Sequence, residues 1–243
     1  MRTPAAGELL ALCERWEGAH PAQRALALVG AAWDGVPDDE PAAWPAGRRD
    51  AELLGLRERL FGPRVVSTAD CPACGERVEL DFAVAAVRVE GEPPPEPLAL
   101  EAEGWALVAR LPTAGDLAAA ATASGVEEAR QVLLERCVVE AHEHGEPRGA
   151  DELPEEVVRA LGAGLAAADP QAEVRLALVC PACGHGWEAL FDIASFLWSE
   201  VEAWSERTLR EVHVLALAYG WREADVLALS PWRRRRYLEM AGA

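Results

Sequence analysis

The feature that most constrains this chain is a five-residue motif that occurs twice. The letters CPACG stand at residues 71–75 and again at 180–184. A Cys-x-x-Cys turn places two thiolates on one edge of a tetrahedron, and the glycine after it lets the backbone turn so that amide groups approach the sulfurs. Two such turns, here called knuckles, supply the four thiolates of one structural Zn²⁺. The predicted ligands are Cys71, Cys74, Cys180 and Cys183.

The flanks of the two knuckles are also alike. The shift along the chain that aligns Cys71 with Cys180 also aligns Glu79 with Glu188 and Phe82 with Phe191. A domain inserted between the halves of a zinc ribbon would explain the long separation, because the cost of closing a loop grows only logarithmically with its length. The alternatives are two unligated turns or two redox dithiols. A redox motif opens a helix beside a parallel sheet, whereas strand-like runs flank these knuckles.

Four thiolates leave zinc no open position for a catalytic water, so the predicted site is structural. His185 follows the second knuckle and could replace one cysteine as a ligand. Because four thiolates already complete the tetrahedron, we expect His185 to pack or hydrogen-bond beside the knuckle. Cys13 and Cys137 lie in apolar helical runs and are predicted core residues.

Apolar periodicity predicts a mainly helical chain. It indicates two helices within residues 6–33, an amphipathic helix over 48–62 and a long helix from Ile193 to Tyr219 that ends at Gly220. Strand-like runs accompany the knuckles at 77–90 and 172–180, and residues 34–47 and 91–97 are predicted to be a loop and an extended linker. The predicted fold class is mainly α with a small zinc-ribbon-like β element (α+β) and a helical segment inserted between the knuckles.

The same patterns give the expected division of the chain. We predict an N-terminal helical region at 1–66, split ribbon halves at 67–90 and 172–192, an inserted mainly helical region at 98–171 and a C-terminal helical block at 193–243. In the insertion, Thr113 is a predicted N-cap with Asp116 at the box position, and a single helix is predicted over 126–144. That helix would place His142 and His144 near its C-terminus, where cationic side chains are more common than metal ligands.

Charge and motifs narrow the function. The net charge is −18, which repels phosphate backbones, and every cationic side chain that is not histidine is arginine. The sequence contains no nucleophile elbow, no phosphate-binding loop and no dinucleotide fingerprint. We therefore predict no enzyme, and neither catalytic nor organic-cofactor-binding residues. With no apolar run long enough to span a bilayer and no signal peptide, a cytoplasmic protein is expected.

The C-terminal stretch SPWRRRRYLEM concentrates arginine in an acidic chain. Ser230 and Pro231 predict the start of a short last helix. Tryptophan and arginine are favoured hot-spot residues of protein interfaces, although a solvated helix end is an equally simple interpretation. The predicted partner-binding residues are Trp221, Trp232, Arg233, Arg234, Arg235, Arg236 and Tyr237.

Four stretches together resemble a known family. They are GRRDAELLGLRERLFGPRV with the first knuckle, RLPTAGDL, the second knuckle, and the run from WEALFDIASFLW to RRRRYLEM. They resemble the baseplate hub assembly chaperones of contractile-tailed phages, in the zinc-knuckle form that accompanies bacterial contractile injection systems. The block 180–240 carries most of the likeness. The resemblance implies a non-enzymatic assembly chaperone or baseplate component, with hub, spike or tail proteins of the same gene cluster as partners and the four cysteines as metal ligands.

Two other functions compete with this one. A zinc-ribbon nucleic-acid adaptor would use the terminal arginines on phosphate, but no second basic stretch supports it. A zinc-dependent hydrolase needs an open coordination position, which a four-cysteine set does not leave. If the assembly role holds, the knuckles form a clasp between distant parts of the chain, and Phe191, Ile193 and Phe196 seat the long helix that follows.

Overall fold

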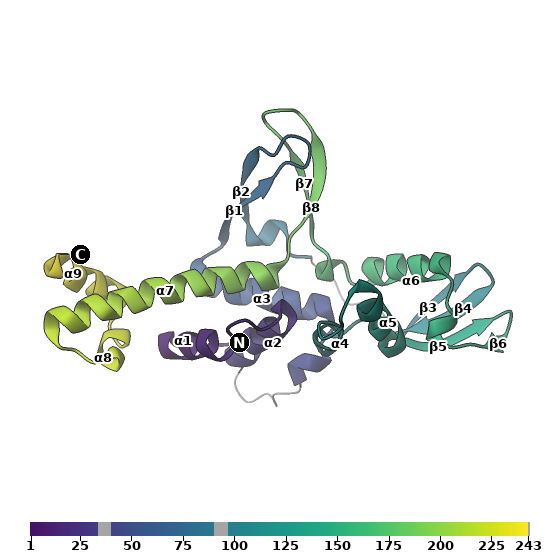
Figure 1. Ribbon diagram of the computed structural model, residues 1–243, viewed down its shortest axis with the longest axis horizontal. Helices are drawn as coiled ribbons and strands as arrows, with labels where there is room; N and C mark the ends of the chain where they lie inside the picture. Colours follow the sequence, from purple (N-terminus) through teal and green to yellow (C-terminus); the bar gives the residue numbers. More distant parts are fainter. Residues whose placement is uncertain (34–39, 90–96, 243) are drawn as a thin grey trace.

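The structure is a computed structural model that describes residues 1–33, 40–89 and 97–242. Residues 34–39 of the predicted loop and 91–96 of the predicted linker lie outside the described residues. The molecule is elongated, with a central helical body from which three parts extend (Figure 1). One is an upright arm of two hairpins, one is a sheet with helices at one end of the long axis, and one is a helical tip at the other end.

The body contains the N-terminal helices and the first half of the longest helix. Its elements are α1 (Ala6–Arg15), α2 (Pro21–Ala32), the 3₁₀ turn η1 (Glu40–Ala43), α3 (Ala46–Phe61) and α7 (Ile193–Tyr219). Capping explains two of the helix starts. Pro21 is the first residue of α2 behind the N-cap His20, and the Asp192 carboxylate accepts from the backbone amides of Ala194 and Ser195 to open α7.

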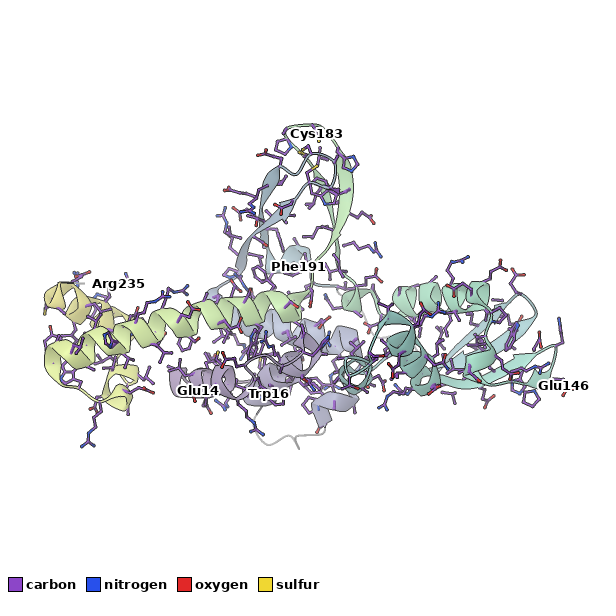
Figure 2. The ribbon with its side chains drawn as sticks, viewed as in Figure 1. Glu14, Trp16, Glu146, Cys183, Phe191 and Arg235 are labelled. Atoms are coloured by element: carbon purple, nitrogen blue, oxygen red, sulfur yellow. The ribbon has the colours of Figure 1, made fainter. Side chains whose placement is uncertain are left out.

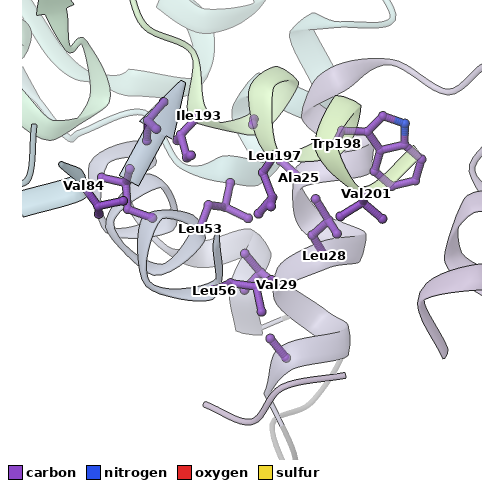
Figure 3. Close-up of a cluster of buried hydrophobic side chains, with 14 of the residues drawn as sticks. Ala25, Leu28, Val29, Leu53, Leu56, Val84, Ile193, Leu197, Trp198 and Val201 are labelled. Atoms are coloured by element: carbon purple, nitrogen blue, oxygen red, sulfur yellow. The ribbon is translucent and has the colours of Figure 1, made fainter. Parts of the chain in front are cut away.

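The main core lies where α2, α3 and the start of α7 meet (Figure 3). Leu28, Leu53 and Leu197 are completely buried there, and Ile193 and Val201 are buried beside them. The polar residue Arg57 is also buried in this region. Its guanidinium donates to both oxygens of Glu200 at 2.9 and 2.8 Å and to the carbonyl of Gly62 at 2.7 Å, which ties α3 to α7.

Two antiparallel hairpins form the arm. They are β1 (Arg64–Asp70) with β2 (Arg77–Ala83), which the 3₁₀ turn η2 (Val84–Ala86) follows, and β7 (Arg175–Val179) with β8 (Gly186–Leu190). Burial alternates along each strand, as the apolar alternation predicts. Each hairpin is a separate two-stranded sheet. The predicted zinc-ribbon-like fold is therefore wrong for the described residues, because no strand pairs across the two hairpins.

The segment between the hairpins is not simply helical. A four-stranded antiparallel sheet in the order β3–β4–β5–β6 packs against α6. The elements are β3 (Leu98–Ala102), β4 (Trp105–Ala109), α4 (Ala114–Ala120), α5 (Val126–Cys137), β5 (Val138–Glu143), β6 (Glu146–Pro147), η3 (Ala150–Glu152), α6 (Glu155–Ala168) and η4 (Pro170–Ala172). The predicted N-cap is confirmed, since the Thr113 hydroxyl accepts from the amide of Asp116.

The sheet corrects the predicted fold class. Of the described residues, 55% are helical and 19% lie in strands of three antiparallel sheets, so the fold is mixed α+β, not mainly α with one small β element. The clearest difference is at 126–144, where the predicted helix stops at Cys137 and β5 begins. The β-branched pair Val138–Val139 favours a strand, and pairing with β4 outweighs the helical pattern before it. His142 therefore lies on a strand and His144 in a turn.

The third part is the distal end of the molecule, formed by the second half of α7 with α8 (Glu223–Leu227) and α9 (Pro231–Ala241). Helix α7 is terminated by Gly220, whose φ of +68° lies in the left-handed region that glycine adopts without strain. Ser230 caps α9 by accepting from the amide of Arg233. Val212, Leu215 and Val226 form a small core of their own here. No helix among the described residues has both the length and the apolar character that crossing a membrane requires.

Candidate metal centre and interaction surface

The four predicted ligand cysteines meet at the end of the arm. Their four Sγ atoms all lie within 4.8 Å of one another. The closest approaches across the hairpins are 3.8 Å for Cys71 with Cys183 and 3.6 Å for Cys74 with Cys180. A tetrahedral zinc with bonds of about 2.3 Å to sulfur has sulfur–sulfur edges of about 3.8 Å. A disulfide needs sulfurs about 2.05 Å apart, and all four thiols are free.

The two knuckles have the same backbone hydrogen bonds. In the first, the amide of Gly75 donates to the carbonyl of Cys71 at 2.8 Å; in the second, Gly184 donates to Cys180 at 2.9 Å. Both glycines have positive φ, +75° and +74°. A side chain at either position would strain the turn, so the shape that the two turns share depends on the glycine in each motif.

The four thiols differ in burial, and the pKa values of Cys180 and Cys74 are shifted in opposite directions. Cys71 and Cys180 are buried, and Cys74 and Cys183 are exposed. The backbone amides of Cys183 and Ala182 lower the pKa of Cys180 to about 7, although burial opposes them. The Glu76 amide lowers the pKa of Cys74, but the neighbouring thiols, with some loss of hydration, raise it to about 12 overall. Four thiolates this close repel one another, and a bound cation removes that repulsion.

His185 lies beside the centre. Its ring is parallel to that of Trp187, with centroids 6.3 Å apart, and its carbonyl accepts from the amide of Cys180 at 2.9 Å. The group of metal-ligating atoms that comes together among the described residues consists of the four sulfurs.

The centre is remote from the helical body, as the position of Cys183 in Figure 2 shows. At the other end of the arm, the rings of Phe82 and Phe191 meet edge to face at 5.3 Å, and Phe191 also contacts Phe196 of α7. Phe191 and Phe196 are partly buried and Ile193 is buried against the body core. The arm thus has aromatic contacts between the hairpins at its base and four cysteines close together at its tip.

The second candidate site is the distal end of α7 with α9. Trp232, Arg233, Arg235 and Arg236 are exposed, and Trp232 exposes 66% of its surface. Arg236 lies over the Trp232 ring at 5.7 Å and pairs with Glu239. Arg233 and Arg235 form no ion pair with the described residues. Figure 2 shows Arg235 at one extreme of the long axis.

The other predicted partner residues have internal roles. Trp221 and Tyr237 meet edge to face at 4.8 Å, and Tyr219 stacks on Trp221. Arg234 is buried between α9 and α7, where its Nε forms an ion pair with Glu211 at 2.9 Å. Trp221, Arg234 and Tyr237 thus pack within the distal end. The other four predicted residues face solvent: Trp232, Arg233, Arg235 and Arg236.

Sequence reasoning missed two exposed apolar residues at this end of the molecule. Met240 is 73% exposed on α9 and Leu217 is 75% exposed on α7. Trp232, Arg236 and Met240 are four residues apart in turn, so they share one face of α9. This spacing was present in the sequence and could have identified Met240. We call Trp232, Arg233, Arg235, Arg236 and Met240 the distal surface.

Together these features define an elongated α+β protein with a four-cysteine centre at the tip of one arm. The chain belongs to the family described as T4 bacteriophage base plate protein, whose match covers residues 33–198. The matched range includes all four cysteines and both hairpins, and it stops before the distal surface. The family membership gives the chain a structural role related to the phage baseplate. No curated protein and no solved structure matches the chain.

Proposed function

We propose that this protein is a non-enzymatic assembly chaperone or structural component for the hub or spike of a contractile, phage tail-like injection system. The observation that carries the proposal is membership of the base plate family over 33–198. The shape supports it, since three projecting parts on one body give separate surfaces for neighbouring proteins (Figure 1). Its partners would be hub, spike or tail proteins encoded in the same gene cluster.

In this proposal the four cysteines hold a structural Zn²⁺. The sulfur separations of 3.6 and 3.8 Å match the edges of a zinc–thiolate tetrahedron. The ion would clasp hairpin β1–β2, which follows the N-terminal helices, to hairpin β7–β8, which leads into α7. Metal analysis of purified protein tests the clasp: we expect one zinc per chain, and loss of zinc in Cys71→Ser/Cys180→Ser. Cys13→Ser is the matched control and should retain the metal.

The distal surface would dock the partner. Aromatic and arginine side chains that are exposed together form hot spots of protein interfaces. Replacement of Trp232, Arg233, Arg235 and Arg236 by alanine should abolish co-purification with baseplate proteins of the cluster. Arg234 is left in place because its removal would leave Glu211 unpaired beneath α9. The matched control is Arg210→Ala, which removes an exposed arginine of α7. Undiminished binding by the folded quadruple variant would exclude the distal surface as the docking site.

A nucleic-acid adaptor is the competing function. Arg233 and Arg235 are exposed and without an ion pair among the described residues, and phosphate would suit them. The net charge of −18 opposes the approach of a polyanion. Retention on duplex DNA that falls steeply with salt, and that the same quadruple variant loses, would favour the adaptor over the assembly role.

A further inference from the structure

A pocket of about 410 Å³ lies where the body, the base of the arm and the inserted segment meet. Residues of α2, α3, α4, α5 and the start of α7 line it, and Phe191 marks the place in Figure 2. Leu190, which also lines the pocket, is 65% exposed, so the pocket opens to solvent. Six of its fourteen lining residues are alanines: Ala22, Ala120, Ala121, Ala129, Ala172 and Ala194.

Two buried charged residues line the same pocket. Arg49 and Asp50 are 6% and 7% exposed. Nε of Arg49 donates to Oδ1 of Asp50 at 2.7 Å, and Nη2 forms an ion pair with the same oxygen, also at 2.7 Å. Oδ2 of Asp50 therefore accepts no hydrogen bond from any described residue. Among the described residues, Trp33, Trp44 and Arg234 hold the fully enclosed polar atoms that lack a partner, and Oδ2 of Asp50 is not one of these atoms. It is therefore accessible from the pocket, where a donor could bind it.

The charge around Asp50 selects the kind of donor. Asp192 lines the pocket. Asp169, which follows α6, contacts the start of α3 and accepts from the amide of Gly47 at 2.8 Å. Arg49 is the one arginine in the lining, and His20 uses its Nδ1 to accept from the amide of Ala22. Asp192 in the lining and Asp169 close by thus add negative charge beside the Arg49–Asp50 pair. The described residues gather no second group of metal-ligating side chains beside the cysteines, so an organic cation fits better than a metal ion.

We propose that this pocket receives a lysine or arginine side chain of a protein partner. Its cationic head pairs with Oδ2 of Asp50, and its aliphatic stem packs on the alanine wall. The chain has no lysine of its own. The pocket lies on the body, away from the distal surface, so its occupant does not depend on the docking proposed for α9.

The titration of Asp50 agrees with this assignment. Burial raises its pKa to about 6; Arg49 lowers it, and Asp192 and Asp169 raise it further. A cation bound at Oδ2 would bring the pKa down again, so binding should weaken as the pH falls below 6. His20 of α2 and Asp192 are further charged or ionisable residues in the lining.

N-acetyl-arginine methylamide is a suitable probe, with its citrulline analogue as the uncharged isostere. The alanine wall gives the readout, because ¹³C-labelled alanine methyl groups report directly on the pocket. We expect saturable shifts of the Ala22, Ala121 and Ala129 methyl resonances with the arginine probe and none with citrulline. Asp50→Asn should weaken binding about tenfold or more, the effect of losing a charge-assisted hydrogen bond. Glu156→Gln, which removes an exposed carboxylate of α6, should leave binding unchanged.

A second variant keeps the test independent of Asp50. Ala121→Phe fills the pocket with an aromatic ring while leaving the Arg49–Asp50 pair intact, and it should also abolish the shifts. Equal shifts with citrulline, unchanged binding by Asp50→Asn, or no saturable shift with the arginine probe would each overturn the proposal.

Discussion

At the scale of single residues, Gly47 shows how closely two segments approach. It lies in the first turn of α3, and a Cβ atom there would fall 1.7 Å from Oδ1 of Asp169, whose other oxygen accepts from the Gly47 amide. We expect Gly47→Ala to displace Asp169 and to lower the free energy of unfolding by about 1–3 kcal/mol, the usual cost of overpacking. Urea denaturation followed by circular dichroism measures this change.

The control for this prediction is another helical glycine. Gly30 in α2 is exposed, and nothing lies within 4 Å of the Cβ that an alanine would add. Gly30→Ala should raise the free energy of unfolding by about 0.5–1 kcal/mol, because alanine loses less conformational freedom in a helix. If Gly47→Ala were as stable as Gly30→Ala, the contact with Asp169 would carry no weight.

Asp50 gives a prediction about pH. Burial raises its pKa to about 6 in the folded protein, against about 4 in an unfolded chain. The folded state therefore holds the proton more tightly, and stability from this group falls as the pH rises from 4 to 6. Two pKa units correspond to about 3 kcal/mol. Asparagine does not titrate, so Asp50→Asn should lack this fall in stability. The unfolding free energy of the variant minus that of the wild type should therefore be larger at pH 7 than at pH 4.5. A gain that is equal at both pH values, or one that Glu156→Gln reproduces, would contradict it.

At the scale of elements, one buried ion pair joins α3 to α7 beside their shared apolar core. Arg57 is 3% exposed and donates to both oxygens of Glu200. We expect Arg57→Ala to lower the free energy of unfolding by about 3–5 kcal/mol, because it leaves Glu200 and the Gly62 carbonyl without their partner. The exposed pair of Arg210 with Glu206 is the comparison, and Arg210→Ala should cost about 0–1 kcal/mol. Similar denaturation midpoints for the two variants would show that the buried pair does not hold these helices together.

The elements also show what the sequence could predict. Helices with clear periodicity and a terminating glycine, such as α3 and α7, were predictable because these signals are local. The strand β5 was not, because a helical pattern runs into it and its partner β4 is remote along the chain. The nearness of the four cysteines was predictable because the motif occurs twice with like flanks. The burial of Arg234 and the exposure of Met240 depend on how α9 packs against α7, which no local pattern specifies.

At the scale of the whole molecule, stability is divided among separate clusters of buried residues. The body, the inserted sheet and the distal end each have their own apolar cluster. The arm has less. Among its four strands only Val65 is buried, and the other inward-facing side chains are half-buried. Two-stranded hairpins are marginally stable alone, so the arm has to be held at its ends.

The dependence of the arm on metal is therefore the sharpest prediction for the whole molecule. Structural zinc contributes on the order of 10 kcal/mol to the folding of small metal-bound units, far more than the half-buried strands can supply. We expect a strong chelator to abolish hydrogen-exchange protection in β1, β2, β7 and β8 while α3, the first half of α7 and the β4–β5 pair keep theirs. The contacts of Phe191 with Phe82 and Phe196 at the base set how far the loss spreads toward α7. Cys71→Ser/Cys180→Ser should reproduce the exchange pattern without chelator. If the arm kept its protection after complete metal removal, packing of the two hairpins alone would hold it, and the cysteines would need another role.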